Sequence, residues 1–207
     1  MSVDYWWIGF FVDEAMHARI KPHFDAALAK SVPSAEACQA ISVWRERPCG
    51  FEETAPNPDR EMPFQIKAFL RAFNRSGFVA LAKQLLARDG ALCDLLNEQT
   101  FFRKATTARH PPVSMVWHAL GFERAKGLPG QMGNMLLHPD EIEAALEATR
   151  RAYEGPSMDD LFASARRYCG LRTNDETLRE ALTFQPDGLQ AALSWNEGFF
   201  ALTCPRI

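Results

Sequence analysis

The chain has 207 residues, of which 47% are hydrophobic, and a formal net charge of −3. This size and composition allow a substantial core within one domain spanning 1–207, and they exclude a disordered chain and a strongly basic nucleic-acid binder. Because no apolar run approaches the roughly 20 residues of a membrane span, and because the five cysteines include no Cys-x-x-Cys pair, we expect a cytoplasmic protein with free thiols and no membrane partner.

Three short segments have the composition of β-strands. Residues 3–12 are apolar at both alternating positions, which is typical of a strand that is covered on two faces. Residues 199–204, FFALTC, follow the turn signal WNEG, and residues 134–137, NMLL, come just before a helix. We predict that both terminal strands and the 134–137 strand form one small mixed sheet.

Most of the remaining chain has the periodicity of amphipathic helices. Helices are predicted over 13–30 (interrupted by Pro22), 34–46, two or three stretches of 62–97, 139–153 and 157–169, with weaker helical turns at 178–182 and 189–193 on either side of QPDG. The predicted fold class is therefore α+β and predominantly helical, with helical hairpins packed on the sheet.

Residues 127–133, GLPGQMG, place three glycines before a helix, as some phosphate-binding loops do. Here no Gly-Lys-Ser/Thr sequence follows, and the helix opens with Pro139, Asp140 and Glu141. The two carboxylates complement the helix dipole themselves and would repel a phosphate group. We interpret the glycine loop as a turn.

No local motif for catalysis or metal binding is present. His17 and His23 lie six residues apart, nearly opposite on a helix, and are poor co-ligands for a metal. An enzyme site could still be assembled by tertiary folding from His118, His138 and carboxylates around the 127–133 glycine loop. This stays an alternative hypothesis, and we expect neither a metal nor a cofactor.

The segment from 62 to 88 contains five basic residues and no acidic one. They are Lys67, Arg71, Arg75, Lys83 and Arg88. The 67–88 basic helices could bind a polyanion, but nucleic-acid binders usually have a basic domain overall and aromatic side chains among the charges. A solvated helix face is the favoured interpretation, with polyanion binding as the alternative and nucleic acid not expected as a partner.

The segment 47–61 carries three prolines and no periodicity, which predicts an exposed loop. Its part GFEETAPNPDRE has four acids against one arginine. Stiffness lowers the entropic cost of ordering a loop on binding, and the negative charge would steer a basic partner. The predicted partner-binding residues are Phe51, Glu52, Glu53, Asp59 and Glu61; an ordinary surface loop is the alternative.

The pieces VWHALGF (116–122) and MGNMLLHPDEIEAAL (132–146), together with the last apolar strand, resemble the YfbM-like group of small bacterial proteins. In that group a helix containing Trp and His precedes a loop, a short strand and a helix that opens with Pro and acids. The resemblance covers residues 113–150. By type, it implies a partner protein, such as an immunity protein that neutralises a toxin delivered by a competing bacterium.

The resulting hypothesis is a protein-binding inhibitor of the bacterial immunity type, which covers or occludes the active surface of a cognate toxin. Such a mechanism needs a complementary surface with a few buried anchors and no cofactor. The expected partner is a protein, namely a cognate toxin with basic character, because the predicted loop is acidic.

Overall fold

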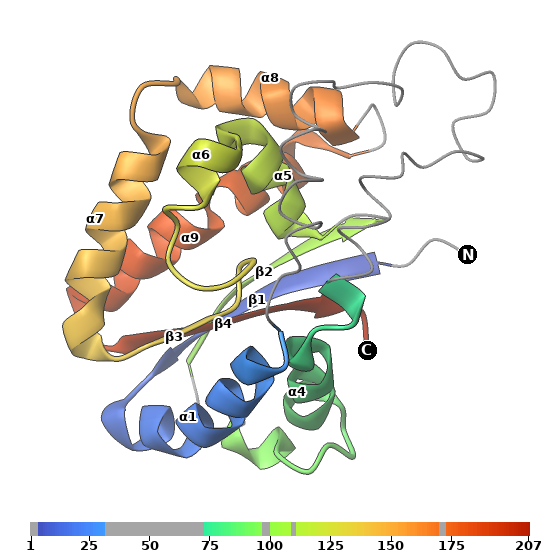
Figure 1. The fold of residues 1–207 in the computed structure, drawn as a ribbon, viewed down its shortest axis with the longest axis vertical. Coiled ribbons are helices and arrows are strands. Elements are labelled where there is room, and N and C mark those ends of the chain that lie inside the picture. Colours follow the sequence, from blue (N-terminus) through green and yellow to red (C-terminus); the bar gives the residue numbers. More distant parts are fainter. Residues whose placement is uncertain (1–3, 32–72, 97–99, 109–110, 170–172) are drawn as a thin grey trace.

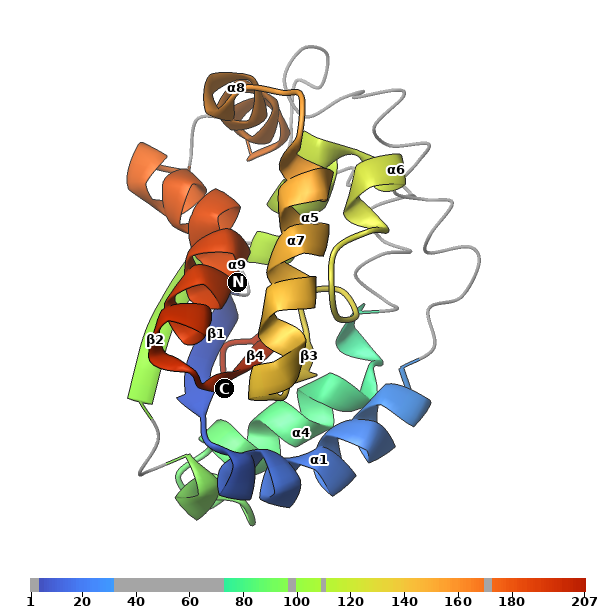
Figure 2. The same cartoon turned by 90° about the vertical axis from the view of Figure 1, so that its left-hand side faces the viewer.

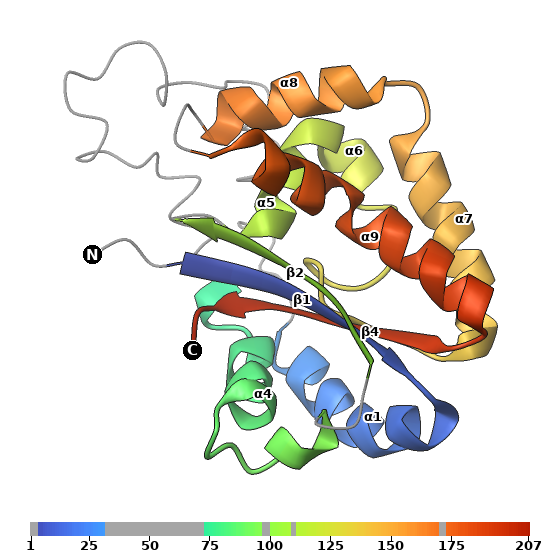
Figure 3. The same ribbon diagram turned by 180° about the vertical axis from the view of Figure 1, so that it is seen from behind.

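The computed structural model describes residues 4–31, 73–96, 100–108, 111–169 and 173–207. Within them a four-stranded antiparallel sheet lies between two layers of helices (Figure 1). Helices α5 to α9 cover one face of the sheet, here called the upper face, and α1 and α4 cover the other, the lower face (Figures 1 and 3). The predicted α+β class is confirmed.

The strand order in the sheet is β2-β1-β4-β3. The strands are β1 (Asp4–Val12), β2 (Thr100–Ala108), β3 (Met135–Leu137) and β4 (Gly198–Pro205). Both terminal strands and the strand near 134–137 are thus confirmed, but all three pairings are antiparallel, so the prediction of a mixed sheet is wrong. β2 is not among the strands predicted from the sequence.

The two terminal strands form the centre of the sheet. β1 and β4 pair from Tyr5 with Pro205 to Val12 with Gly198, and the Arg206 N–H donates to the Asp4 carbonyl at 2.8 Å. β1 needs apolar side chains at both alternating positions because it has a core on each face. Trp7 and Phe11 belong to the upper core, whereas Ile8, Phe10 and Val12 belong to the lower one.

The lower layer contains α1 (Glu14–Ala29), α4 (Gly77–Leu86) and a short 3₁₀ helix, η1 (Cys93–Leu95). Asp13 caps α1 by accepting from the Met16 N–H. Pro22 does not interrupt α1 as predicted: it lies on the exposed side, while the buried side chains of Ile20 and Phe24 hold the helix in place. Burial of this apolar face outweighs the missing backbone hydrogen bond.

The upper layer contains α5 (Pro112–Leu120), α6 (Phe122–Ala125), the 3₁₀ helix η2 (Pro139–Glu141), α7 (Ile142–Tyr153), α8 (Met158–Cys169) and α9 (Asp175–Trp195). The helices predicted at 139–153 and 157–169 are confirmed. The two separate turns predicted on either side of QPDG are wrong, because α9 runs through Pro186 without a break. Gly188 lets α9 approach the sheet: a Cβ there would lie 2.5 Å from the Phe199 ring.

Three sequence predictions fall wholly or partly outside the described residues. They are the helix at 34–46, the exposed loop at 47–61 and the first part of the 62–97 helical region. Of that region, α4 and η1 are described. None of the helices that the structure describes is long and apolar enough to cross a membrane.

Candidate functional site

The predicted partner-binding residues Phe51, Glu52, Glu53, Asp59 and Glu61 all lie outside the described residues. The same holds for Lys67 and Arg71 at the start of the predicted basic stripe. Of that stripe, Lys83 lies on the exposed side of α4. Both the acidic-loop hypothesis and the polyanion hypothesis therefore stay predictions.

The glycine loop forms a tight turn, as predicted. Gln131 and Asn134 exchange two backbone hydrogen bonds of 2.8 and 2.9 Å, and both residues between them, Met132 and Gly133, have positive φ. Two central residues with positive φ are the signature of a type I′ hairpin turn. The Gly133 carbonyl accepts from the buried Trp7 Nε1 at 2.9 Å, which ties this turn to the centre of the sheet.

The next residue after the turn, Asn134, is also used structurally. It is 2% exposed, its Oδ1 accepts from the Thr203 N–H at 2.9 Å, and its Nδ2 donates to the Gln131 carbonyl at 3.0 Å. The polar groups of the loop thus bond to the fold itself, and a ligand cradle of convergent N–H groups is not what they build.

The histidines of the alternative enzyme site lie in different surroundings. His118 is 5% exposed on α5, and its Nδ1 lies 3.4 Å from the Ser164 hydroxyl of α8, in the upper layer. His138 follows β3 and lies beside α1, which belongs to the lower layer, with its ring centroid 5.2 Å from that of His17. The structure therefore gives these two histidines separate sets of neighbours.

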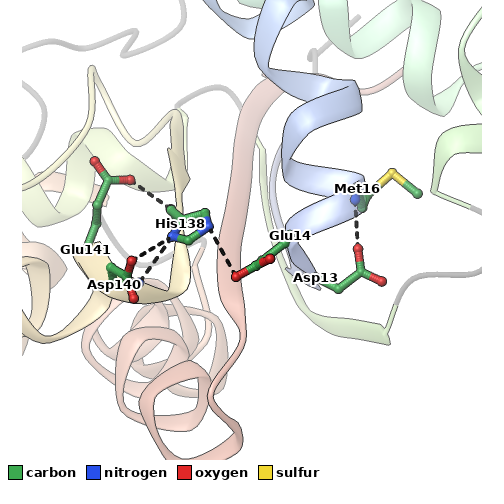
Figure 4. Close-up of polar contacts among 6 residues, drawn as sticks. All are labelled: Asp13, Glu14, Met16, His138, Asp140 and Glu141. Carbon is green, nitrogen blue, oxygen red and sulfur yellow. Dashed lines mark hydrogen bonds and ion pairs between the residues drawn. The ribbon is translucent and has the colours of Figure 1, made fainter.

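His138 caps the helix that follows it (Figure 4). Its Nδ1 accepts from the Asp140 N–H at 3.4 Å, and its own N–H donates to the Glu141 carboxylate at 2.8 Å, which is a capping box. Its Nε2 lies 3.9 Å from the Glu14 carboxylate of α1. The carboxylate oxygen Oδ2 of Asp140 also lies 3.5 Å from the His138 Nδ1.

The pKa of His17 at this junction is shifted by its surroundings. Burial lowers the pKa of His17 below its ordinary value, and the neighbouring His138 lowers it further. Glu141 and Asp25 act in the opposite direction. Among the described residues no group of three His, Cys, Asp or Glu side chains is placed to hold a metal ion. The contacts of His138 with Glu14 and His17 join α1 to the start of η2.

The more unusual surface lies at the other edge of the sheet, along β2. In the part of the chain that the structure describes, β2 pairs with β1 alone. From Lys104 to Ala108 its side chains alternate between exposed and buried. Helix α9 covers the upper face of β2, whereas α1 and α4 lie under the other strands (Figure 2). None of the described helices therefore covers the lower face of β2, which we call open.

Large side chains gather on this open face. Phe101 is 53% exposed and packs edge-on against Phe10 of β1, with ring centroids 5.7 Å apart. The Lys104 ammonium lies 4.8 Å from the centre of the Trp6 ring. We call the free edge of β2 together with Trp6, Phe101, Lys104 and Thr106 the β2 surface.

The two basic residues on β2 differ in whether their charge is paired. Arg103 points to the upper face, where it donates to Thr183 at 2.9 Å and pairs with Asp187 at 2.7 Å. No ion pair joins Lys104 to a carboxylate of the described residues, and its side chain is exposed. Among the described residues, the β2 surface thus combines an exposed aromatic side chain, a cation without an ion pair and an unpaired strand edge.

Near the start of β2, a further aromatic side chain is exposed on the upper face. Trp195, the last residue of α9, is 58% exposed and packs against Phe11 with ring centroids 4.7 Å apart. Phe11 pairs with Thr100, the first residue of β2, and Phe10 pairs with Phe101. Exposed aromatic side chains therefore flank this end of the strand on both faces, as is common at protein interfaces.

Comparison with protein-family models, with curated proteins and with solved structures finds no match for the chain.

Proposed function

We propose that the protein is a protein-binding inhibitor of the bacterial immunity type, which neutralises a cognate toxin by covering or occluding its active surface. The β2 surface is the observation that supports this proposal most directly. Exposed aromatic side chains beside an unpaired strand edge are groups that gain binding energy when a second protein removes them from water. An occluding inhibitor needs such anchors and no reactive group of its own.

The roles of the polar clusters also favour binding over catalysis. His138 caps a helix, the glycine loop is a hairpin turn, and Asn134 bonds to β4. His138 and the glycine loop are two of the parts of the alternative enzyme site, together with His118. The hydrogen bonds of His138, the loop and Asn134 stabilise the fold, whereas Phe101 and Lys104 of the β2 surface are largely exposed to solvent.

We further propose that the protein acts in the cytoplasm. Two described cysteines, Cys93 and Cys204, are free thiols. Burial raises the pKa of the Cys204 thiol to about 12, so this residue behaves as a small apolar side chain of the core and not as a nucleophile. Free thiols at these two positions suit a reducing compartment.

The acidic residues Glu52, Glu53, Asp59 and Glu61 remain part of the proposal as a second contact with a basic region of the toxin. These four residues lie outside the described residues, as does any contact between them and the β2 surface. The proposal therefore assigns the aromatic anchors to β2 and keeps electrostatic steering by the 47–61 loop as a separate prediction.

The experiment is a growth assay with the natural partner. Tagged full-length protein is isolated from its native cells, and the stoichiometric partner is identified by mass spectrometry. That partner is then expressed in a bacterial host, alone, with this protein, or with an unrelated protein at the same level. We expect growth arrest by the partner alone and recovery only with this protein; a harmless partner, or arrest that persists, would contradict the proposal.

A further inference from the structure

The inference concerns how the β2 surface holds its partner. We propose that an extended, acidic segment of the partner adds to the free edge of β2 as a fifth strand. This rests on the proposed function only in requiring a protein partner; the partner need not be a toxin. The identity of the segment follows from the backbone, the charge and the side chains of β2.

The backbone of β2 supplies the first argument. In any edge strand, alternate residues direct their N–H and C=O groups away from the neighbouring strand, and these groups can pair with an extended segment. β2 is nine residues long and pairs regularly with β1 from Asp4 opposite Ala108 to Gly9 opposite Arg103. Strands of five or six residues are common in sheets, so β2 is long enough to template another.

The charge of β2 decides which segment it accepts. The strand contains Arg103, Lys104 and no acid. Asp187 neutralises Arg103, whereas Lys104 lies exposed over the Trp6 ring. Opposite charges that face each other in neighbouring strands stabilise the pair, and like charges destabilise it. An acidic side chain beside Lys104 satisfies this cation, and a basic or neutral segment does not.

The same charge argues against a second copy of this chain. In a symmetric antiparallel pair of two β2 strands centred on Lys104, the two ammonium groups would face each other. Lysine on an edge strand is a known protection against self-association of that kind. The cation thus discourages pairing between copies and favours an acidic partner.

The side chains on the lower face complete the description. Phe101, Lys104 and Thr106 all lie on this face, and Trp6 lies beside Lys104 on β1. An added strand would lay every second side chain along the same face. We therefore expect an acidic residue beside Lys104 and an apolar residue beside Phe101, where the exposed ring offers an apolar contact.

The experiment uses the full-length chain and the partner isolated with it from its native cells. Affinity is measured for the unaltered protein, for Lys104→Glu and for the control Lys126→Glu, an equal change of charge at an exposed site just after α6. We expect at least a tenfold loss of affinity for Lys104→Glu and less than a twofold change for the control. Thermal unfolding checks that both variants are folded.

Hydrogen exchange measures the protection of backbone amides in β2, which side-chain contact alone would not change. Strand addition buries outward-facing amides, so residues 100–108 of the unaltered protein should exchange at least tenfold more slowly in the complex. Unchanged exchange in β2, or unchanged affinity of Lys104→Glu, would overturn the inference. Protection of β2 in a dimer without the partner would overturn it in favour of a second copy.

The two proposals can fail separately. If the partner protects β2 but does not arrest growth, strand addition stands and the immunity-type function fails. If the partner is a toxin that the protein neutralises while β2 exchanges as before, the function stands and the inhibitor uses another surface.

Discussion

At one edge of the sheet, β3 has three residues and leads directly into His138, whose ring lies against His17 of α1. At the other edge, β2 has nine residues, an open lower face and exposed aromatic side chains. A short edge closed by neighbouring elements is one way in which proteins avoid unwanted strand pairing. The β3 edge uses this device, and β2 relies on Lys104 instead.

The polar groups at the two edges of the sheet have different bonding partners. At the β3 edge the caps, the turn and the Asn134 side chain bond within the chain. At the β2 edge the upper face is tied to α9 by Arg103, and the lower face is left to solvent. The β3 edge is therefore expected to matter for stability and the β2 edge for binding. The following predictions test that division, from the largest effect to the smallest.

The largest effect on stability is expected at Trp7, which lies on the central strand β1. Trp7 is 0% exposed, and its ring stacks on that of Phe184 with centroids 4.2 Å apart. Its Nε1 donates a hydrogen bond to the Gly133 carbonyl. Trp7→Ala should lower the free energy of unfolding by about 3–5 kcal/mol, as for large buried aromatics. Urea denaturation measures this, with the exposed Trp195→Ala as the control. Equal losses in the two variants would contradict this description of the core.

The β3 edge should respond to Asn134→Ala. The substitution leaves the buried Thr203 N–H without its acceptor, and an unsatisfied buried group costs about 1–3 kcal/mol. Urea denaturation should show a loss of that size. Ser194→Ala, which removes an exposed hydrogen bond to Gln190, should change stability by less than about 0.5 kcal/mol. If Asn134→Ala were as stable as the parent, the β3 edge would not contribute to stability as proposed.

The β2 edge should respond in binding and not in stability. Phe101→Ala removes a half-exposed ring, so we expect a loss of less than about 1 kcal/mol in the free energy of unfolding. Affinity for the natural partner should fall about tenfold, which is about 1.4 kcal/mol. Leu28→Ala, at another exposed apolar side chain on α1, serves as the control for titration calorimetry. Full affinity in Phe101→Ala would mean that β2 is not the interface.

The smallest effect is a pH dependence at the β3 edge. His17 faces His138 and Glu141 across the junction, Lys21 and Asp25 lie on its own helix, and its pKa in the folded protein is below the ordinary 6.5. Near that pH the unfolded chain binds more protons than the folded one, so stability falls as the pH drops through 6.5 toward the folded-state pKa.

Replacing His17 tests this linkage. In His17→Gln the fall in stability between pH 8 and pH 5 should be smaller than in the parent, by a few tenths of a kcal/mol for a partly exposed group. Urea denaturation at a series of pH values measures the difference. An identical pH profile for the two proteins would show that the junction does not sense protonation of His17.

The strongly patterned elements could be predicted from the sequence. β1 was recognisable because both of its faces are apolar, and α7 because Pro139 and two acids open an amphipathic segment. β2 was not recognisable, because its alternation at 104–108 involves Lys, Ala and Thr and has little contrast in hydrophobicity. The Thr-rich and Phe-rich composition of 100–107 was the available signal for a strand.

The candidate site could be predicted only in part. The turn at 127–133 followed from its glycines and from the acids after it. The separate surroundings of His118 and His138 could not be inferred, because they depend on which layer of helices each residue joins. Nor could the length of α9, since Pro186 and Gly188 break helices on their own, while packing on Phe199 supports the continuous helix.

The sequence by itself determined the α+β class, the two terminal strands, the strand before α7 and the turn of the glycine loop, because each depends on local periodicity or on residues with restricted φ and ψ. Only the tertiary structure decided that β2 lies at an edge with one open face. The physical reason is that exposure depends on which elements cover a strand, and that covering comes from residues far away in the chain.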